Sequence, residues 1–371
     1  MKTALVYDRV NKWGGAERVL LALHEIFPEA PLYTSVSDLN SAPWAKVFSK
    51  VVPSFLQKIP FAKSKHEFLG ALTPIAFESF DFSGYDLVIS VTSEAAKGII
   101  TKPGTLHICY CLTPTRYLWS GYDMYFKNPI LRFLSKPVVS YLRIWDKVAA
   151  QRPDILVAIS TVVKDRIKKY YNRQSEIVFP PTDSHHKNSL LRVSPKAKTS
   201  HSFLLDANSD YFLVVSRLVP YKRVDLAVKV FNRLKLPLVI VGTGSERLKL
   251  RLMAGKNIKF VGEVTDGELA DYYKGARALI MPQEEDFGIV SVEAQAFGVP
   301  VIAFKKGGAK ETVIEGKTGL FFDQQTPESL IAAVERFDKM VFNRRELVNN
   351  AEKFSQEKFK NEFQRLVEEK R

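Results

Sequence analysis

Short apolar runs alternate with amphipathic segments along the first half of the chain, and this alternation predicts its fold class. Residues 3–7 form an apolar run with the length of a buried strand, and the glycine-containing turn 13–17 precedes a helical segment at 18–26. Further runs of strand length occupy residues 86–91, 106–110 and 155–159. Strands that alternate with helices are typical of a parallel sheet covered by helices, so we expect a doubly wound α/β domain.

A polar, irregular stretch interrupts this alternation between residues 182 and 210, after which the same pattern starts again. The second series of apolar runs lies at residues 211–215, 238–241, 258–261, 278–281 and 299–302. We therefore predict two Rossmann-like domains, at residues 1–185 and 210–354, joined by a linker at 186–209. The last segment, residues 355–371, is an amphipathic helix whose pattern is compatible with packing on either domain, including back on the first.

Length and composition agree with this organisation. A chain of 371 residues is longer than one hydrophobic core usually supports, which favours two domains with a ligand cleft between them. Its two cysteines, Cys109 and Cys111, stand in an apolar run, so we interpret them as buried core residues of a cytoplasmic protein. The apolar start of the chain ends at Asp8 and Arg9, too early for a signal peptide.

The net charge of +14 calls for an acidic partner, for which nucleic acid, anionic lipid and a phosphorylated substrate are the alternatives. Residues 50–65 and 127–152 mix basic with large apolar side chains, which favours peripheral attachment to an anionic membrane, at its inner face. The same mixture also fits helices that pack on their own domain with a solvated basic face. Nucleic acid is disfavoured because the sequence contains no known recognition module or repeat of stacking aromatics.

Polar residues directly after the predicted strands of the second domain are the candidates for chemistry, because ligands of doubly wound sheets bind beyond the carboxyl ends of the strands. Ser216, Arg217 and Lys222 follow the first of these strands, and two cations there suit a diphosphate. Gly242 and Gly244 follow the second strand, where they permit close approach of a ligand or form an ordinary tight turn. A nicotinamide dehydrogenase is disfavoured, since the turn after the chain's first strand lacks a full GxGxxG motif.

The strongest local feature is a pair of glutamates, Glu285 and Glu293, separated by seven residues. If a helix begins near Gly288, its first amides point at the ligand and the helix dipole adds positive charge there. Those amides would belong to Phe287, Gly288, Ile289 and Val290. Such a terminus suits a phosphate, while Glu285 would accept hydrogen bonds from sugar hydroxyls and Glu293 would reach a ribose.

Taken together, these motifs resemble glycosyltransferase family 4, the retaining enzymes of GT-B fold, and within it the mannosyltransferase-like subgroup. The second domain carries the resemblance through SRLVPYKRVDLAV, VGTGSE, NIKFVGEV, EEDFGIVSVEAQAFGVPVIAF, GGAKETV and EGKTGLFFD. The first domain adds WGGAERVL, SGYDLVISVTSEAAKGI, HICYCLTPTRYLW and IVFPPTD. The resemblance therefore covers almost the whole chain.

This resemblance implies a role for each candidate residue. Arg217 and Lys222 would hold the diphosphate of a nucleotide diphosphate-sugar, with GDP-mannose favoured, and Glu285 would hold the transferred sugar. The region of Glu263 and Val264 would cup the nucleotide base. The full set of remaining donor-binding candidates is Gly15, Ser216, Gly242, Gly244, Glu263, Val264, Phe287, Gly288, Ile289, Val290 and Glu293. The resemblance further implies no cofactor and no metal, and the chain has no Asp-x-Asp motif.

One departure from the family concerns Leu112, where relatives usually carry a histidine that faces the donor sugar. Leucine cannot hydrogen-bond to a sugar or a phosphate. The alternatives are therefore a transferase that acts on a glycan or polyprenyl-linked acceptor and a catalytically weak or silent binder of nucleotide sugars. The acceptor-side candidates, for which ordinary loop packing is the other interpretation, are Gly14, Leu112, Arg116, Tyr117 and Trp119.

Overall fold

The structure is a computed structural model that describes residues 1–60, 69–182 and 210–370 of the chain. These residues form two compact units. Unit 1 comprises Met1–Pro181 together with Phe359–Arg371, and unit 2 comprises Thr182–Lys358. The predicted linker at 186–209 and the predicted end of the first domain at residue 185 lie outside the described residues.

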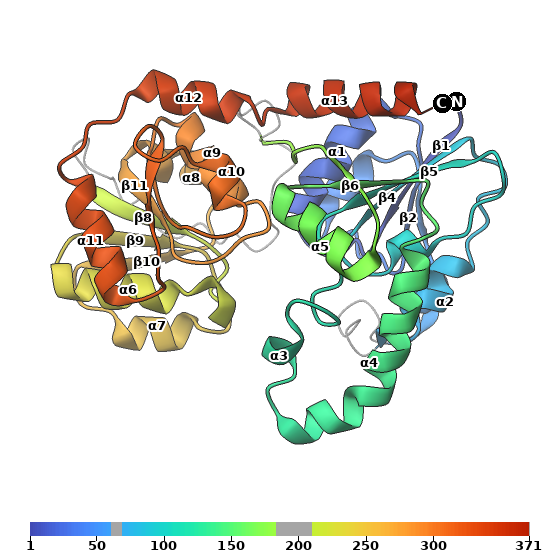
Figure 1. Cartoon of the computed structure of the whole chain (residues 1–371), viewed down its shortest axis with the longest axis horizontal. Helices are drawn as coiled ribbons and strands as arrows, with labels where there is room; N and C mark the ends of the chain where they lie inside the picture. The colour runs from blue at the N-terminus through green and yellow to red at the C-terminus, as the bar shows by residue number, and fades with distance from the viewer. Residues whose placement is uncertain (61–68, 183–209, 371) are drawn as a thin grey trace. The chain divides into compact units, whose positions relative to one another are not determined.

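Unit 1 is built on a seven-stranded parallel sheet with the strand order β3-β2-β1-β4-β5-β6-β7 (Figure 1). Its strands are β1 (Thr3–Tyr7), β2 (Leu32–Thr34), β3 (Val51–Pro53), β4 (Leu87–Thr92), β5 (Leu106–Cys111), β6 (Ile155–Ala158) and β7 (Glu176–Ile177). Its helices are α1 (Gly15–Ile26), α2 (Thr73–Glu78), α3 (Tyr122–Tyr125), α4 (Pro129–Ala149) and α5 (Thr161–Tyr171), with 3-10 turns η1 (Pro43–Val47), η2 (Phe55–Lys58) and η4 (Ala96–Gly98).

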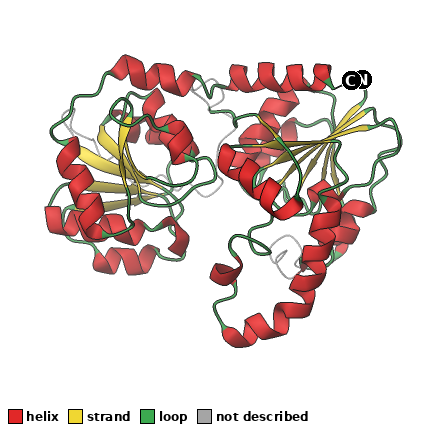
Figure 2. Cartoon of the chain, viewed as in Figure 1, coloured by secondary structure: helices red, strands yellow, loops and turns green. Residues whose placement is uncertain are grey.

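Most residues of the central strands of unit 1 are buried, because helices cover both faces of the sheet (Figure 2). The last helix, α13 (Gln356–Glu369), supplies one of these covers: Phe359 and Phe363 lie with their ring centroids 5.8 and 6.3 Å from that of Tyr110 on β5. The final amphipathic segment thus returns to the sheet of unit 1.

Unit 2 contains a six-stranded parallel sheet with the order β10-β9-β8-β11-β12-β13. Its strands are β8 (Tyr211–Val215), β9 (Leu238–Val241), β10 (Ile258–Gly262), β11 (Ala276–Met281), β12 (Val301–Phe304) and β13 (Gly319–Phe322). Its helices are α6 (Val224–Leu234), α7 (Arg247–Met253), α8 (Asp266–Lys274), α9 (Ile289–Ala296), α10 (Ala309–Thr312), α11 (Pro327–Phe337) and α12 (Arg344–Glu352), with the 3-10 turn η6 (Pro220–Lys222) after β8.

Alternate residues of the unit 2 strands enter two separate cores, as the two-residue period of a strand requires. On β8, Phe212 and Val214 pack with the apolar face of α6 and α11, whereas Tyr211 and Leu213 pack with α8, α9 and α10. The prediction of two Rossmann-like parallel-sheet domains is therefore confirmed.

Both sheets have the strand order 3-2-1-4-5-6, which is a common order of doubly wound folds, with one further strand in unit 1. The direction of winding reverses between β1 and β4 in unit 1 and between β8 and β11 in unit 2. Loops that leave the carboxyl ends of these strand pairs diverge and expose the edge where ligands of such folds bind. Among the described residues, no helix has the length and apolar character needed to cross a membrane.

Candidate functional site

The loop after β8 carries the two cations that the sequence places at a diphosphate. Arg217 is exposed, donates a hydrogen bond to the Tyr221 hydroxyl and has its guanidinium carbon 6.0 Å from the centroid of that ring. The Lys222 ammonium lies 5.2 Å from the same ring centroid. The Tyr221 ring therefore contacts both cations.

The glycines after β9 fix the position of this loop. Gly242 and Gly244 have φ angles of 126° and 156°. A Cβ atom on Gly242 would lie 1.9 Å from the backbone carbonyl oxygen of Ser216. One on Gly244 would lie 2.3 Å from the backbone carbonyl oxygen of Leu218. The positive φ angles agree with a tight turn, and the close approach of the loop after β8 is a further reason for glycine at both positions. The interpretation as a ligand contact stays a prediction.

An ion pair joins the loops after β8 and β11 at the point where the winding of the sheet reverses. The Lys222 ammonium pairs with the Glu285 carboxylate, and both side chains are mostly buried, at 13% and 14% exposure. The Gln283 side-chain amide donates to the same carboxylate oxygen over 2.9 Å. Of the three residues expected to hold the diphosphate and the transferred sugar, the structure thus brings Lys222 and Glu285 together, whereas Arg217 points to Tyr221.

Backbone contacts from the loop after β12 hold Glu285 in place. The Gly308 amide donates to the Glu285 carbonyl oxygen over 2.8 Å, and Gly307 forms an isolated bridge with Glu285. A Cβ atom on Gly308 would lie 2.4 Å from the Phe287 Cα atom, and one on Gly307 would lie 2.2 Å from the backbone carbonyl oxygen of Glu285. Only glycines allow the two loops to approach this closely.

The helix α9 begins beside Glu285, as the sequence predicts. Gly288 is its N-cap, with a φ angle of 88°, and no side chain caps the first turn. The amides of Ile289 and Val290 lie in that turn, so the positive end of the helix dipole falls next to the ion pair. Phe287 is buried, with its ring centroid 5.4 Å from that of Phe354. This terminus and the two cations would attract the same anion.

The remaining donor candidates lie around this centre in unit 2. Glu293 is buried on α9 and accepts a hydrogen bond of 2.9 Å from the Tyr273 hydroxyl of α8. Glu263 is exposed just after β10, and Val264 packs at the edge of the core between the sheet and α8. The positions are compatible with their predicted roles at the nucleoside, which the structure does not test.

The corresponding edge of unit 1 is organised by Asp8, directly after β1. Its buried carboxylate accepts hydrogen bonds from the Thr92 hydroxyl and from the backbone amides of residues 93–96, at 2.7 to 3.0 Å. Arg9 and Glu94 form an ion pair beside it, with side chains 18% and 21% exposed. Burial raises the pKa of Glu94, an effect that the Arg9 guanidinium opposes.

Two glycines predicted for the donor and acceptor lie at the same edge. Gly14 is the N-cap of α1, with extended backbone, and Gly15 is the first residue of the helix. A Cβ atom built on Gly15 meets no described atom within 4 Å. The helix thus starts three residues earlier than the sequence pattern indicates.

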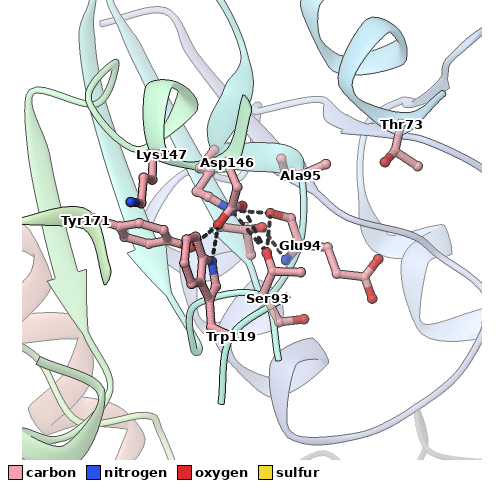
Figure 3. A network of polar contacts seen from close by, with 12 residues as sticks. Thr73, Ser93, Glu94, Ala95, Trp119, Asp146, Lys147 and Tyr171 are labelled. Carbon is pink, nitrogen blue, oxygen red and sulfur yellow. Dashed lines mark hydrogen bonds and ion pairs between the residues drawn. The ribbon is translucent and has the colours of Figure 1, made fainter. Parts of the chain in front are cut away.

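A buried polar cluster supports the loop that follows β5 (Figure 3). The Asp146 carboxylate of α4 pairs with the Lys97 ammonium over 2.6 Å, and each side chain is 1% exposed. It also accepts hydrogen bonds from the Thr115 hydroxyl, the Trp119 indole and the Tyr171 hydroxyl, at 3.0, 2.7 and 2.8 Å. Burial lowers the pKa of Lys97, but the Asp146 charge more than offsets it, so the pKa is raised.

This cluster locates the predicted acceptor-side residues. Trp119 stacks on Tyr170 with ring centroids 5.1 Å apart, and its indole N–H is bound to Asp146. Tyr117 packs its ring edge-on to Tyr125 at 6.3 Å, and burial raises the pKa of its hydroxyl. The carbonyl oxygen of Arg116 accepts from the amides of residues 119 and 121. Loop packing therefore explains the internal contacts of this segment.

Leu112 lies half-buried directly after β5, where its amide donates to the Thr92 carbonyl oxygen over 2.8 Å. His107, on the same strand, is fully buried, and its Nε2 atom lies 2.8 Å from the Ser90 hydroxyl. Burial, together with the nearby Arg152 charge, lowers the pKa of His107 to about 3, so its ring is neutral in the core. His107 is thus part of the core. It does not supply the imidazole that the family resemblance places at position 112.

Several residues that organise these edges carry no role that the sequence predicts. Tyr221 stands between the two predicted cations, and Asp8 directly follows the first strand, so their positions could have marked them. The Lys97–Asp146 pair joins residues 49 positions apart and leaves no local pattern. Within residues 1–60, 69–182 and 210–370, no group of three His, Cys, Asp or Glu side chains is placed to hold a metal ion.

Known proteins match this chain in two ways: by sequence, mainly over unit 2, and by structure, over both units. The family model of group 1 glycosyl transferases matches residues 196–354. D-inositol 3-phosphate glycosyltransferase 2 of Catenulispora acidiphila is 30% identical over 163 residues, which are 38% of this chain and 38% of the relative. GDP-mannose-dependent alpha-(1-6)-phosphatidylinositol monomannoside mannosyltransferase of Mycolicibacterium smegmatis is 33% identical over 138 residues, 32% of this chain and 36% of the relative. The chain thus spans little more than a third of these relatives.

Solved structures match over both units. HepE of Anabaena in complex with UDP has a TM-score of 0.69 at 16% identity, covering 100% of each chain. Sucrose-phosphate synthase of Thermosynechococcus elongatus has a TM-score of 0.74 at 17% identity, covering 100% of this chain and 99% of that one. Over residues 196–354 the chain therefore matches the group 1 glycosyl transferases, and its two units together have the GT-B fold of solved glycosyltransferases.

Proposed function

We propose that the protein is a retaining glycosyltransferase of family 4 that moves a hexose from a nucleotide diphosphate-sugar to a glycan or polyprenyl-linked acceptor. The observation that carries this proposal is the Lys222–Glu285 ion pair beside the uncapped N-terminus of α9, at the edge of unit 2 where the winding reverses. A diphosphate carries the charge that such a terminus and two cations stabilise, and a sugar supplies hydroxyls for a carboxylate.

In the proposed reaction, the acceptor hydroxyl attacks C1 of the sugar on the face from which the diphosphate departs. The new C1–O bond forms as the bond between C1 and the diphosphate oxygen breaks, and the hydroxyl proton passes to a departing phosphate oxygen. Lys222, Arg217 and the α9 terminus would stabilise the negative charge that grows on the leaving group. Glu285 would orient the sugar through its hydroxyls, and attack from the departing face retains the configuration at C1.

The relatives guide the choice of donor without deciding it. The Mycolicibacterium smegmatis protein is named as GDP-mannose-dependent, whereas HepE has been solved with UDP-glucose. We favour GDP-mannose, since the subgroup that the sequence motifs resemble transfers mannose. Glu293, held by Tyr273 on α8, would accept a ribose hydroxyl of either nucleotide.

A donor screen tests this function. We expect one of GDP-mannose, UDP-glucose and UDP-N-acetylglucosamine to bind in calorimetry and to be hydrolysed slowly when no acceptor is supplied. Leu112→His should raise the hydrolysis rate, because an imidazole can hydrogen-bond to the sugar where leucine cannot. A Leu112→Val variant is the control for a change of size at this position.

Leu112 itself favours the second candidate, a binder that does not transfer sugar. Binding without turnover in both the wild type and the Leu112→His variant, also with polyprenyl-linked acceptors present, would support that candidate. Failure of every nucleotide sugar to bind would reject both functions.

Metal removal provides a separate test. Because two side-chain cations and a helix terminus are available for the diphosphate, we expect EDTA to leave the transfer rate unchanged, and added Mg²⁺ or Mn²⁺ to give no increase. The rate measured before and after chelation, with the same donor and acceptor, checks this. Strong inhibition by EDTA that Mn²⁺ reverses would contradict a metal-independent mechanism.

A further inference from the structure

The helix α4 of unit 1 exposes an unusual amount of apolar surface. Eight of the large apolar side chains that the described residues leave exposed lie on this one helix. Ile130, Phe133, Leu134 and Ile144 are 71%, 69%, 67% and 68% exposed, although side chains of this kind are normally buried. In Figure 1 the first half of α4 lies farther from the unit 1 sheet than its second half.

The exposed side chains form one stripe along the helix. Ile130, Leu134, Tyr141, Ile144 and Val148 follow one another at intervals of three, four or seven residues, which places them on one face of an α-helix. A different face, with Val139, Leu142 and Asp146, is buried against unit 1. The apolar stripe is therefore additional to the face that the fold itself needs.

The charges of α4 separate from this stripe in the same regular way. Arg132, Lys136, Arg143 and Lys147 recur at intervals of four and seven residues, which places them together on another face of the helix. Arg143 donates to the Leu118 carbonyl oxygen and, like Lys147, lies over the Trp119 ring, whereas the Lys136 ammonium lies 5.7 Å from the ring centroid of exposed Phe133. The single acidic residue of the helix, Asp146, faces inward and is neutralised by Lys97. Arg132 pairs with exposed Asp123 of α3, and Lys127 adds a cation just before the helix. The exposed surface of α4 itself thus combines apolar residues with positive charge alone.

We propose that this surface, residues 127–148, docks the protein on an anionic lipid bilayer, with the apolar stripe inserted between the headgroups and the cations beside the phosphates. Charge complementarity selects this occupant: exposed apolar side chains accompanied by the exposed lysines Lys127 and Lys136 fit a surface of anionic headgroups. Cations along the length of the helix remain hydrated when the helix lies in the interface. In this arrangement the helix lies flat in the headgroup region and does not cross the bilayer.

The inner face of the same helix connects this surface to the proposed chemistry. Asp146 holds the Thr115 hydroxyl and the Trp119 indole, which belong to the loop that the sequence analysis places on the acceptor side. If the proposed function holds, docking through α4 presents this loop to an acceptor that is anchored in lipid. This link rests on the proposed function; the docking surface itself rests only on α4.

Vesicle flotation with the full chain tests the proposal. We expect the wild type to float with vesicles of phosphatidylcholine mixed with phosphatidylglycerol, and much less with phosphatidylcholine alone or at high salt. The triple variant Phe133→Ser, Leu134→Ser, Ile144→Ser and the double variant Lys127→Glu, Lys136→Glu should each lower binding at least tenfold. The control is Leu248→Ser with Leu252→Ser on α7, where two leucines that are more exposed than the substituted α4 residues are removed from unit 2.

Thermal unfolding and nucleotide-sugar calorimetry on every variant separate docking from folding and from the transferase function. Loss of flotation with unchanged unfolding and donor binding supports the proposal, whether or not sugar transfer is ever observed. Wild-type protein that does not float with anionic vesicles at low salt overturns it. Equal flotation of the α4 variants also overturns it, and if those variants at the same time turn a wild-type dimer into a monomer, the stripe is an interface between two copies of the chain.

Discussion

The Lys222→Ala variant is expected to lower kcat/KM for sugar transfer at least tenfold. Lys222 would form a charge-assisted contact with the departing diphosphate, and such contacts contribute roughly 1.5–3 kcal/mol. The substitution also leaves the mostly buried Glu285 carboxylate without its ion-pair partner. Because the charge on the diphosphate grows as the bond to C1 breaks, the loss should appear more in kcat than in donor affinity.

Matched variants separate charge from shape at this pair. Lys222→Arg keeps the cation and should retain more activity than Lys222→Ala. Glu285→Gln keeps the shape of the side chain and removes its negative charge, so it tests the other partner of the ion pair. Lys229→Ala removes an exposed cation from the adjacent helix α6 and should leave kcat/KM unchanged. If Lys222→Ala behaves like Lys229→Ala with the donor found in the screen, the ion pair has no part in transfer, and the proposed placement of the diphosphate is wrong.

The central strands of both sheets could be predicted from sequence alone, because each is a continuous apolar run. The runs at 3–7, 211–215 and 238–241 coincide with β1, β8 and β9. The sequence pattern missed β2, β3, β7 and β13. Two of these have three residues and one has two, too few for a run to stand out, while β13 begins at a glycine and lies inside the motif EGKTGLFFD.

The sequence predicts those residues of the candidate site that directly follow a strand. Arg217, Lys222 and Glu285 follow β8 and β11, and the parallel order of these neighbouring strands places their loops together. The sequence could not show that Lys222, and not Arg217, pairs with Glu285, because that depends on the turn η6 and on the glycines after β12. The roles assigned to the base, ribose and acceptor residues remain predictions.

Contacts between distant polar residues lay beyond the sequence pattern altogether. Asp8 binds four successive backbone amides more than eighty residues away, and a single aspartate after a strand does not announce this. Asp146 stands among basic residues in the segment 127–152, where it would pass for one more solvated charge. Its burial follows only from the way α4 packs on unit 1, so the structure changes what is expected of its substitution.

The Asp146→Ala variant should unfold unit 1 at a temperature lower by on the order of 10 °C. Its carboxylate is the counter-ion of Lys97 and the acceptor for Thr115, Trp119 and Tyr171. Removing one partner of a buried ion pair costs about 3–5 kcal/mol, because the remaining charge stays buried without compensation. Thermal unfolding followed by circular dichroism measures the change, and Asp123→Asn is the control, since it removes an exposed carboxylate paired with Arg132.

A second substitution distinguishes the ion pair from the other contacts of Asp146. Adding Lys97→Met to Asp146→Ala removes the uncompensated ammonium and should restore part of the lost stability, so the two substitutions will not be additive. Donor binding in unit 2 should persist in both variants, because none of these side chains belongs to that unit. Equal unfolding temperatures for Asp146→Ala and Asp123→Asn would mean that Lys97 and Asp146 are hydrated in solution, and the loop from Thr115 to Trp119 would then lack the support that the fold assigns to it.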